Sequence, residues 1–176
     1  MLQDPIITEN PGDRCYFCKK KIFGAILRAA ESDGYPVLMD GTNASDDCND
    51  RPGMRAIREL KVLSPLRICG LTKAEIRETS RKVGLFTWDK PAYACLATRI
   101  PTGEPITAGK LSRTQWAEAY LHSLGFLDFR VRTFEDRAKI QVKQGDLPLV
   151  LSRREEIVST LKEQYREVLL DLEVRV

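Results

Sequence analysis

Residues 36–47 read Pro-Val-Leu-Met-Asp-Gly-Thr-Asn-Ala-Ser-Asp-Asp, a short apolar run followed directly by a polar loop. An apolar run of roughly four to eight residues between turn signals is typical of a strand buried in a parallel sheet. Ligands of such sheets bind just beyond the carboxyl ends of the strands. The stretch predicts an α/β fold whose loop residues Gly41, Asn43 and Asp46 bind a nucleotide. A turn rich in Asn and Asp, without any ligand, explains the same residues equally well.

Outward from this stretch, signals for helices and strands alternate. Apolar residues with helical spacing at 22, 25, 26 and 29 predict a helix that follows the turn Asn10-Pro11-Gly12-Asp13 and ends at Gly34. We further expect a short helix over 52–60, a strand at 62–63 and a helix over 72–84. Thr72 and Glu75 form a capping box at the start of the last helix. Two strands are too few for a doubly wound sheet, so this half resembles part of a parallel-sheet domain.

The second half of the chain has a different pattern. A long loop over 86–110 precedes an expected helix over 112–124, opened by a Ser112–Gln115 cap and closed by Gly125. Alternating residues predict strands at 129–133 and 138–142, then a helix opened by Ser152 and a terminal strand over 170–176. This order predicts a small α+β domain. We expect a domain boundary near residue 100, with 101–176 serving substrate binding or oligomerisation.

Composition excludes several classes of protein. The chain has 176 residues, 43% hydrophobic and 30% charged, which is typical of a folded domain and not of a disordered chain. No apolar run approaches the roughly 20 residues of a membrane span, and the N-terminus lacks the features of a secretory signal. The net charge of +3 is small for a nucleic-acid-binding protein. We therefore expect a cytoplasmic protein with no membrane or nucleic-acid partner.

Cysteines supply the best candidate metal ligands. Cys15 and Cys18 form a C-x-x-C motif at a predicted helix start, where the helix dipole favours thiolates. Cys95, in the long loop, is the best third ligand, and three thiolates suit an iron–sulfur cluster or zinc with one open position. Incidental thiols at the helix start, and a buried apolar role for Cys95, are the alternatives. Cys48 is a possible fourth ligand, and Cys69 is expected in the core or at a strand end.

A basic strand face is the second candidate site. Arg130 and Arg132 lie two residues apart on a predicted strand, so both side chains project from one face, where they can grip a phosphate. A solvated outer face is the alternative. Phe129 and Val131 point the other way, toward the core, so the face lacks the stacking aromatics of an RNA-binding sheet. Glu118, on the preceding helix, is expected at the surface.

Five motifs occur in a fixed order along the chain. They are Asp13-Arg14-Cys15-Tyr16-Phe17-Cys18-Lys19, Asp40-Gly41-Thr42-Asn43-Ala44-Ser45-Asp46, Asp50-Arg51-Pro52-Gly53-Met54, Ser64-Pro65-Leu66 with Gly70-Leu71-Thr72-Lys73, and Trp88-Asp89-Lys90-Pro91 with Cys95-Leu96-Ala97-Thr98-Arg99-Ile100-Pro101. From about residue 10 to the C-terminus, this ordered set resembles the LarE family. The members of that family are ATP-dependent sulfur transferases of nickel-pincer nucleotide biosynthesis.

The resemblance implies a PP-loop ATP pyrophosphatase domain, an adenine nucleotide alpha hydrolase-like fold, with a C-terminal α/β extension. It implies that ATP with Mg²⁺ adenylates a carboxylate of a pyridinium dicarboxylate mononucleotide, and that a sulfur nucleophile then displaces AMP to leave a thiocarboxylate. In one branch of the family the cysteine matching Cys95 gives up its own sulfur. In another, cysteines matching Cys15, Cys18 and Cys95 hold a four-iron–four-sulfur cluster, and the presence of all three favours this branch.

The resemblance also assigns the residues that bind the substrate phosphate. Thr98, Arg99, Arg130 and Arg132 fall at those positions, and Glu118 approximately matches an acidic position of the family. A homo-oligomer is expected. The S-G-G-x-D-S phosphate loop of the family does not occur in these 176 residues. We therefore expect a fragment, or half of a split enzyme, that does not cleave ATP by itself.

Two other classes of function remain open from the sequence. One is another PP-loop enzyme, of the NAD-synthetase, GMP-synthetase or tRNA-thiolating type. The Gly41–Asp46 loop is compatible with such an enzyme, whereas the Cys95 loop is not. The other is a non-catalytic module that binds metal or RNA.

Overall fold

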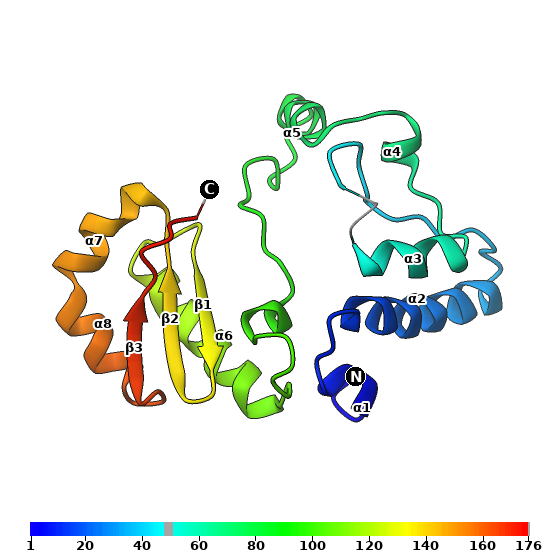
Figure 1. Cartoon of the computed structure of the whole chain (residues 1–176). Helices are drawn as coiled ribbons and strands as arrows, with labels where there is room; N and C mark the ends of the chain where they lie inside the picture. Colours follow the sequence, from blue (N-terminus) through cyan, green and yellow to red (C-terminus); the bar gives the residue numbers. More distant parts are fainter. Residues whose placement is uncertain (48–50, 176) are drawn as a thin grey trace. The chain divides into compact units, whose positions relative to one another are not determined.

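The computed structural model describes residues 1–47 and 51–175, so Cys48, suggested as a fourth metal ligand, lies outside the described residues. The chain divides into two compact units (Figure 1). Residues Met1–Asn10 and Pro91–Val176 form one, called here the sheet unit, and Pro11–Lys90 form the other, called the helical unit. The boundary predicted at residue 100 lies inside the sheet unit.

The sheet unit contains a three-stranded mixed sheet in the order β1-β2-β3. β1 (Arg130–Phe134) and β2 (Arg137–Gln141) pair antiparallel, and β3 (Glu167–Leu170) pairs parallel to β2. The two predicted strands are confirmed and form a hairpin, in whose turn Glu135, with φ of 50°, takes the left-handed backbone conformation. The terminal strand predicted over 170–176 is wrong over 171–174, since β3 begins earlier and ends at Leu170, and Val176 lies outside the described residues. One isolated parallel bridge, Lys143 with Arg175, continues the pairing there, and Leu172 is 86% exposed.

Several helices and helical turns accompany this sheet. They are α1 (Pro5–Thr8), η1 (Leu96–Arg99), α6 (Ala108–Ser123), η2 (Gln144–Asp146), α7 (Leu147–Ser152) and α8 (Arg154–Leu161). α6 begins earlier than predicted, because Thr107 caps it by accepting a hydrogen bond from the backbone N–H of Lys110 at 3.1 Å. Gly125, with φ of 97°, follows its C-terminus as predicted. Ser152 ends α7 and does not cap α8, whose N-cap is Arg153.

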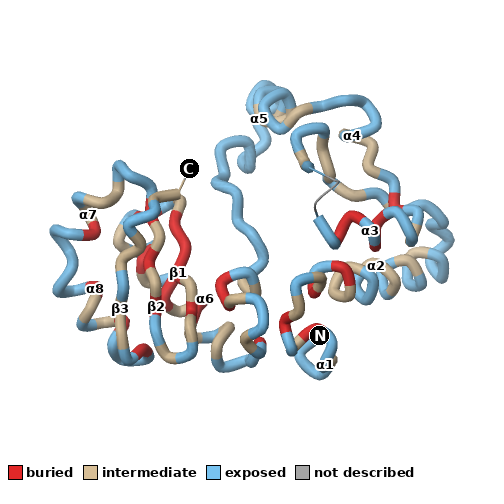
Figure 2. Tube along the Cα trace, in the orientation of Figure 1, coloured by how far each residue is buried: buried red, intermediate tan, exposed pale blue. Residues whose placement is uncertain are grey.

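The core of the sheet unit joins one face of the sheet to three helices. In β1 and β2 the residues of this face lie opposite each other, as Val131 with Ile140 and Thr133 with Ala138. Helices α6, α7 and α8, together with residues that flank the strands, contribute the rest, and Figure 2 marks buried segments on the strands and on these helices. The cluster contains Ala117, Leu121, Phe126, Phe129, Val131, Ala138, Ile140, Val142, Val150, Ile157, Leu161 and Tyr165.

The N-terminal residues belong to the sheet unit through backbone pairing. The Asn10 carbonyl accepts from the N–H of Gly103 at 2.9 Å, and the Thr8 carbonyl accepts from the N–H of Ile106 at 2.7 Å. The Asn10 side chain, 1% exposed, donates to the Pro101 carbonyl at 2.6 Å. These bonds fix the segment that follows the Cys95 loop.

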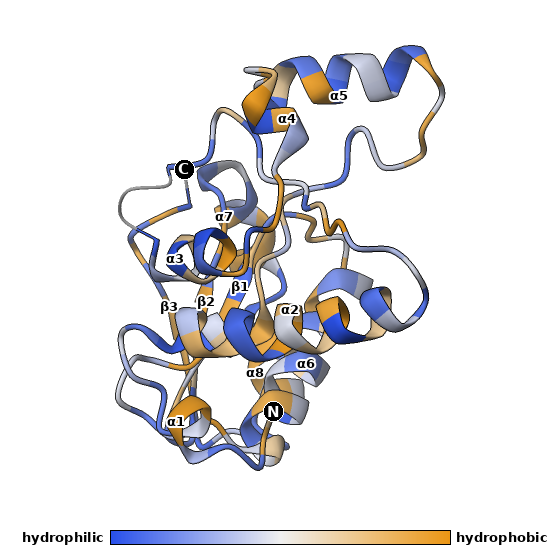
Figure 3. Ribbon diagram, turned by 90° about the vertical axis from the view of Figure 1, so that its right-hand side faces the viewer, coloured by the Kyte–Doolittle hydropathy of each residue, from blue (hydrophilic) through white to orange (hydrophobic). Residues whose placement is uncertain are grey.

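The helical unit consists of α2 (Arg14–Ser32), α3 (Pro52–Glu59), α4 (Pro65–Ile68) and α5 (Lys73–Lys82). The predicted helices are confirmed, including the capping box of Thr72 and Glu75, whereas the single turn α4 was not predicted. Tyr16 on α2 donates to the Glu59 carboxylate of α3 at 2.8 Å. Hydrophobic and hydrophilic stretches alternate along α2 (Figure 3), and only Arg14 and Tyr16 are buried in it.

The predicted parallel strands of the helical unit are reduced to one bridge. Met39 pairs parallel with Leu63, through N–H···O bonds of 2.9 Å from Leu63 to Leu38 and 2.8 Å from Asp40 to Leu63. The direction of the pairing agrees with the expectation. Val37 and Met39 are nevertheless 53% and 60% exposed, so the sheet core expected around them is not formed by the described residues. A partial PP-loop sheet therefore remains a prediction.

Within the described part of the chain, no helix combines the length and apolar character needed to cross a membrane.

Candidate functional site

Cys95 lies exposed on a loop that a hydrogen-bonded turn holds in place. It is the N-cap of η1, and its carbonyl accepts from the backbone N–H of Thr98 at 2.9 Å and from the Thr98 hydroxyl at 2.7 Å. The turn forms because the short Thr side chain reaches back to the carbonyl three residues earlier. The thiol is therefore presented to solvent from a defined backbone.

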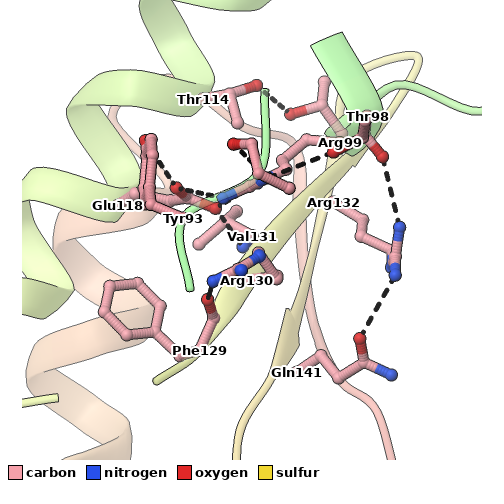
Figure 4. A network of polar contacts seen from close by, with 12 residues as sticks. Tyr93, Thr98, Arg99, Thr114, Glu118, Phe129, Arg130, Val131, Arg132 and Gln141 are labelled. Carbon is pink, nitrogen blue, oxygen red and sulfur yellow. Dashed lines mark hydrogen bonds and ion pairs between the residues drawn. The ribbon is translucent and has the colours of Figure 1, made fainter. Parts of the chain in front are cut away.

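The residue that ends this turn, Arg99, is buried against α6. It is 1% exposed, and its Nε and Nη2 donate to the two carboxylate oxygens of Glu118 at 2.8 and 3.1 Å (Figure 4). Its Nη1 donates to the carbonyls of Ala94 at 3.0 Å and Cys95 at 3.3 Å, and to the Thr98 hydroxyl at 3.1 Å. The expectation that Glu118 lies at the surface is wrong. The carboxylate is buried because a buried guanidinium pairs with it in a bidentate geometry.

Glu118 binds two further groups. Its Oε2 accepts from the Tyr93 hydroxyl at 3.1 Å, and its Oε1 accepts from the backbone N–H of Val131 in β1 at 3.0 Å. Burial, followed by the charge of Glu118 and its hydrogen bond, raises the pKa of the Tyr93 hydroxyl. The Tyr93 ring also contacts the guanidinium of Arg99, whose carbon lies 5.0 Å from the ring centroid.

Arg130 is buried rather than lying on a solvated outer face. It is 7% exposed and donates to the carbonyls of Phe129 and Ala92, both at 2.6 Å. Burial, with the positive charges of Arg99 and Arg175, lowers its pKa. The segment before Cys95 covers this face of β1, which alternation along the strand alone does not predict.

Arg132 is the least constrained of the four residues expected to bind the substrate phosphate. Its two contacts are long, 3.3 Å from Nη1 to the Thr98 carbonyl and 3.4 Å from Nη2 to Oε1 of Gln141 (Figure 4). The structure links Thr98, Arg99 and Arg132 by hydrogen bonds, and places Arg130 5.8 Å from the ring of Tyr93. Their role in phosphate binding is not tested by this geometry and stays a prediction.

The sequence interpretation missed the role of Glu118 and did not single out Tyr93. The buried residues of α6 are Thr114, Ala117, Glu118 and Leu121, which follow the i, i+3, i+4, i+7 spacing of a core-facing stripe. That spacing was the signal that Glu118 faces inward. Tyr93 carried no comparable signal.

Cys15 and Cys18 lie in the first turns of α2, in the helical unit, whereas Cys95 belongs to the sheet unit. The Sγ of Cys15 is exposed and lies 3.8 Å from Nη2 of Arg14, while Cys18 is half-buried. The shared ligand role of the three cysteines stays a prediction. Cys69 follows α4 and is exposed, so the expectation of a core position or strand end is wrong.

Polar side chains order the Gly41–Asp46 loop. Asp40 accepts from the hydroxyls of Thr42 and Ser64, both at 2.7 Å, and Asp46 accepts from the backbone N–H of Asn43 at 3.0 Å. Burial raises the pKa of Asp40, but the hydrogen bonds from Thr42 and Ser64 outweigh it and leave the pKa below its usual value. The loop is therefore ordered both by its own side chains and by residues that follow it, since Arg67 also donates to the Asp46 carbonyl at 2.7 Å.

Three known proteins are similar in sequence to this chain, and the name of one of them states an activity. The chain is 31% identical, over 97% of its length, to a protein of Lactiplantibacillus plantarum named pyridinium-3,5-bisthiocarboxylic acid mononucleotide synthase. It is also similar to uncharacterized proteins of Synechocystis, at 41% identity over 80% of the chain, and of Methanocaldococcus jannaschii, at 31% over 96%. The chain spans 53–66% of the length of these relatives. No family model matches it.

Proposed function

We propose that this chain is part of a LarE-type sulfur transferase, which converts a carboxylate of a pyridinium dicarboxylate mononucleotide into a thiocarboxylate. The similarity to the named relative extends over 97% of this chain, and the motifs quoted above occur in order in the sequence of this chain. The observation that carries the proposal is the placement of an exposed Cys95 on a turn whose Thr98 is hydrogen-bonded to Arg132. An exposed thiol on the same turn as a carbonyl that a guanidinium binds suits transfer of sulfur to an anionic substrate.

Within this proposal, Arg132 is the main phosphate ligand of the sheet unit. A guanidinium has five N–H donors in a fixed planar geometry, and its long contacts to Thr98 and Gln141 leave it free to bind a phosphate in a bidentate manner. The Thr98 hydroxyl already donates to the Cys95 carbonyl, so it contributes less. Arg130 holds the backbone beside the site, because its guanidinium donates to the carbonyls of Phe129 and Ala92.

The loop of Gly41, Asn43 and Asp46 is the proposed nucleotide contact of the helical unit. A methyl group built at Gly41 would meet no atom within 4 Å, and Gly41 does not adopt a positive φ. Glycine is therefore not required there by the described fold, which is compatible with close approach of a ligand to the backbone. ATP with Mg²⁺ would activate the substrate carboxylate, and adenylation requires the phosphate-binding elements of the whole protein.

For the sulfur source, we propose an iron–sulfur cluster held by Cys15, Cys18 and Cys95. Cys15 and Cys18 are separated by one helical turn, so their side chains project from the same side of α2. The exposed Cys15 and Cys95 thiols are free of disulfides, as a cluster requires. The cluster would supply sulfur to the activated carboxylate, whereas donation by Cys95 itself would leave dehydroalanine at position 95.

A titration of a pyridinium dicarboxylate mononucleotide tests the proposal. We expect Arg132→Ala to weaken binding roughly tenfold to a hundredfold, because a hydrogen bond to a charged group contributes about 1.5–3 kcal/mol. Arg137→Ala is the matched control, since Arg137 lies on the same hairpin, is half-exposed and pairs with Glu167 at 3.0 Å. Equal affinities of wild type and Arg132→Ala, or no binding to the wild type, would contradict the proposed role of this site.

A further inference from the structure

We infer that Arg99 and Glu118 form a buried clamp that fixes the loop carrying Cys95, and that Arg99 is a positioning residue rather than a phosphate ligand. The inference rests on the proposed function only in treating Cys95 as the functional thiol. It reassigns Arg99, which the resemblance places among the phosphate ligands.

The first argument is the use of the Arg99 donors. Nε, Nη1 and Nη2 all donate within the sheet unit, to the Glu118 carboxylate, to the carbonyls of Ala94 and Cys95, and to the Thr98 hydroxyl. The side chain is 1% exposed. A phosphate at this guanidinium would have to displace the Glu118 carboxylate and leave it buried without its partner, which is strongly unfavourable.

The second argument is the set of groups that meet at Glu118. Its two oxygens accept hydrogen bonds from Arg99, from the Tyr93 hydroxyl and from the N–H of Val131. Among the strands that the structure describes, β1 lies at the edge of the sheet, so this N–H has no partner strand there, and Glu118 satisfies it. One carboxylate of α6 therefore joins the loop on the N-terminal side of Cys95, the turn after Cys95 and the edge of the sheet.

The consequence is that the clamp holds the peptide groups on both sides of the thiol. Arg99 binds the carbonyl of Ala94, which precedes Cys95, and the carbonyl of Cys95 itself. Arg130 adds a bond to the Ala92 carbonyl at 2.6 Å. Loss of the Glu118 charge removes the partner that orients Arg99. The turn Leu96–Arg99 should then open more often, while the rest of α6 and the sheet keep their packing.

Hydrogen exchange of backbone amides tests the clamp directly. In Glu118→Gln we expect the Thr98 and Ile100 amides, which donate to the carbonyls of Cys95 and Ala97, to exchange roughly tenfold faster or more. Gln115→Ala is the matched control, because Gln115 is exposed on the same helix. Unchanged exchange at Thr98 in Glu118→Gln would overturn the inference.

A double variant separates the clamp from general stabilisation. Replacing both members of a buried ion pair by apolar residues is often neutral for stability. Arg99→Met/Glu118→Leu should therefore unfold at a denaturant concentration close to the wild-type value, while exchange at Thr98 stays fast. Slow exchange at Thr98 in this variant would show that the pair only fills space, and would overturn the inference.

Substrate binding distinguishes this inference from the proposed function. In Arg99→Lys we expect the affinity for the pyridinium dicarboxylate mononucleotide to change less than threefold while exchange at Thr98 rises, because lysine cannot make the paired contacts to Glu118. A tenfold loss of affinity with unchanged exchange would make Arg99 a phosphate ligand. Absence of mononucleotide binding to the wild type would contradict the proposed function and leave the exchange test of the clamp intact.

Discussion

The two compact units bury their apolar residues to very different degrees. In the sheet unit, twelve buried hydrophobic residues form one cluster between a sheet face and three helices. In the described part of the helical unit the corresponding cluster contains only Met54, Ile57 and Val62. Large apolar side chains there remain in contact with solvent, including Ile22 at 42% and Ile26 at 44% exposure.

This difference does not arise from weaker sequence signals. The apolar run at 36–39 predicts a buried strand as strongly as the alternation at 129–133. The residues around the two segments differ, however, so that Val131 is buried and Met39 is 60% exposed. Val131 pairs with Ile140 and packs under the helices, whereas Met39 makes a single bridge with Leu63. Parallel strands are stable when both of their faces are covered. Burial is therefore a property of the assembled surfaces and not of the pattern alone.

The largest expected effect comes from removing core volume in the sheet unit, compared with removing an exposed apolar side chain in the helical unit. Leu121, 0% exposed in α6, fills the core of the sheet unit, and Leu121→Ala should lower its free energy of unfolding by about 2–5 kcal/mol. Met39→Ala removes a side chain that is 60% exposed, and should change the stability of the helical unit by no more than about 0.5 kcal/mol.

The two tryptophans allow each unit to be followed separately. Trp116 lies in α6 of the sheet unit and Trp88 in the helical unit, so unfolding in denaturant can be read in a Trp88→Phe and a Trp116→Phe background. Equal losses for Leu121→Ala and Met39→Ala would show that the contrast in burial between the units has no energetic counterpart.

Local signals predicted the elements better than their assembly. The capping box at Thr72, the strands at 129–133 and 138–142 and the helix end at Gly125 were predicted correctly, because each depends on a few neighbouring residues. The start of α6 was predicted too late. Ser112 and Thr107 both have a hydroxyl that can cap a helix, and in the structure Thr107 is the N-cap. The terminal strand was predicted too far along the chain, because the alternation of apolar and polar residues continues past Leu170. The continuous pairing of β3 with β2 ends at that residue.

Removing a helix cap should cause a loss of stability of intermediate size. Thr107 caps α6 in the sheet unit and Thr72 caps α5 in the helical unit, each by accepting from a backbone N–H three residues later. Replacing either by Ala should cost about 0.5–2 kcal/mol. The Thr107→Ala loss should appear in the global unfolding of the sheet unit, because α6 packs in its core. The Thr72→Ala loss should appear as faster hydrogen exchange confined to α5, which contains no buried residue.

A Ser in place of either Thr is the control, since it keeps the capping hydroxyl. A loss of global stability in Thr72→Ala as large as in Thr107→Ala would mean that α5 unfolds together with the rest of its unit. The contrast between the two units would then be limited to apolar burial.

The candidate site was only partly predictable. Cys95 and Thr98 were named from a motif and the two arginines of β1 from alternation along a predicted strand, and the structure links Thr98 to Arg132. The bond between Arg99 and Glu118 joins residues 19 positions apart, and no local pattern specifies that pairing. Burial of Arg130 was missed for the same reason, since the segment that covers it comes from a different part of the chain.

The smallest expected effect is the loss of stability at acid pH, which we compare for one carboxylate in each unit, Asp128 in the sheet unit and Asp40 in the helical unit. Burial raises the pKa of Asp128, but hydrogen bonds and charges from Lys143 and Arg175 outweigh it, so the folded pKa lies below the usual value. Asp40 also has a lowered pKa, held mainly by the hydroxyls of Thr42 and Ser64 against the effect of burial. A lowered folded pKa means that the stabilisation is complete above the unfolded pKa of about 3.9 and is lost as the pH falls through the folded value.

Salt should separate these two carboxylates. Asp128 interacts with full charges near the surface, so its contribution, of about 1 kcal/mol or less, should shrink at roughly 1 M salt, where screening acts within about 3 Å. The uncharged hydroxyl donors of Asp40 are little affected by screening. The test compares Asp128→Asn and Asp40→Asn with wild type by unfolding from pH 6 to pH 2, at low and high salt. We expect salt to reduce the effect of Asp128→Asn in the sheet unit and to leave that of Asp40→Asn in the helical unit unchanged. The opposite dependence would show that charge pairing, rather than hydroxyl donation, holds Asp40 and the Gly41–Asp46 loop in place.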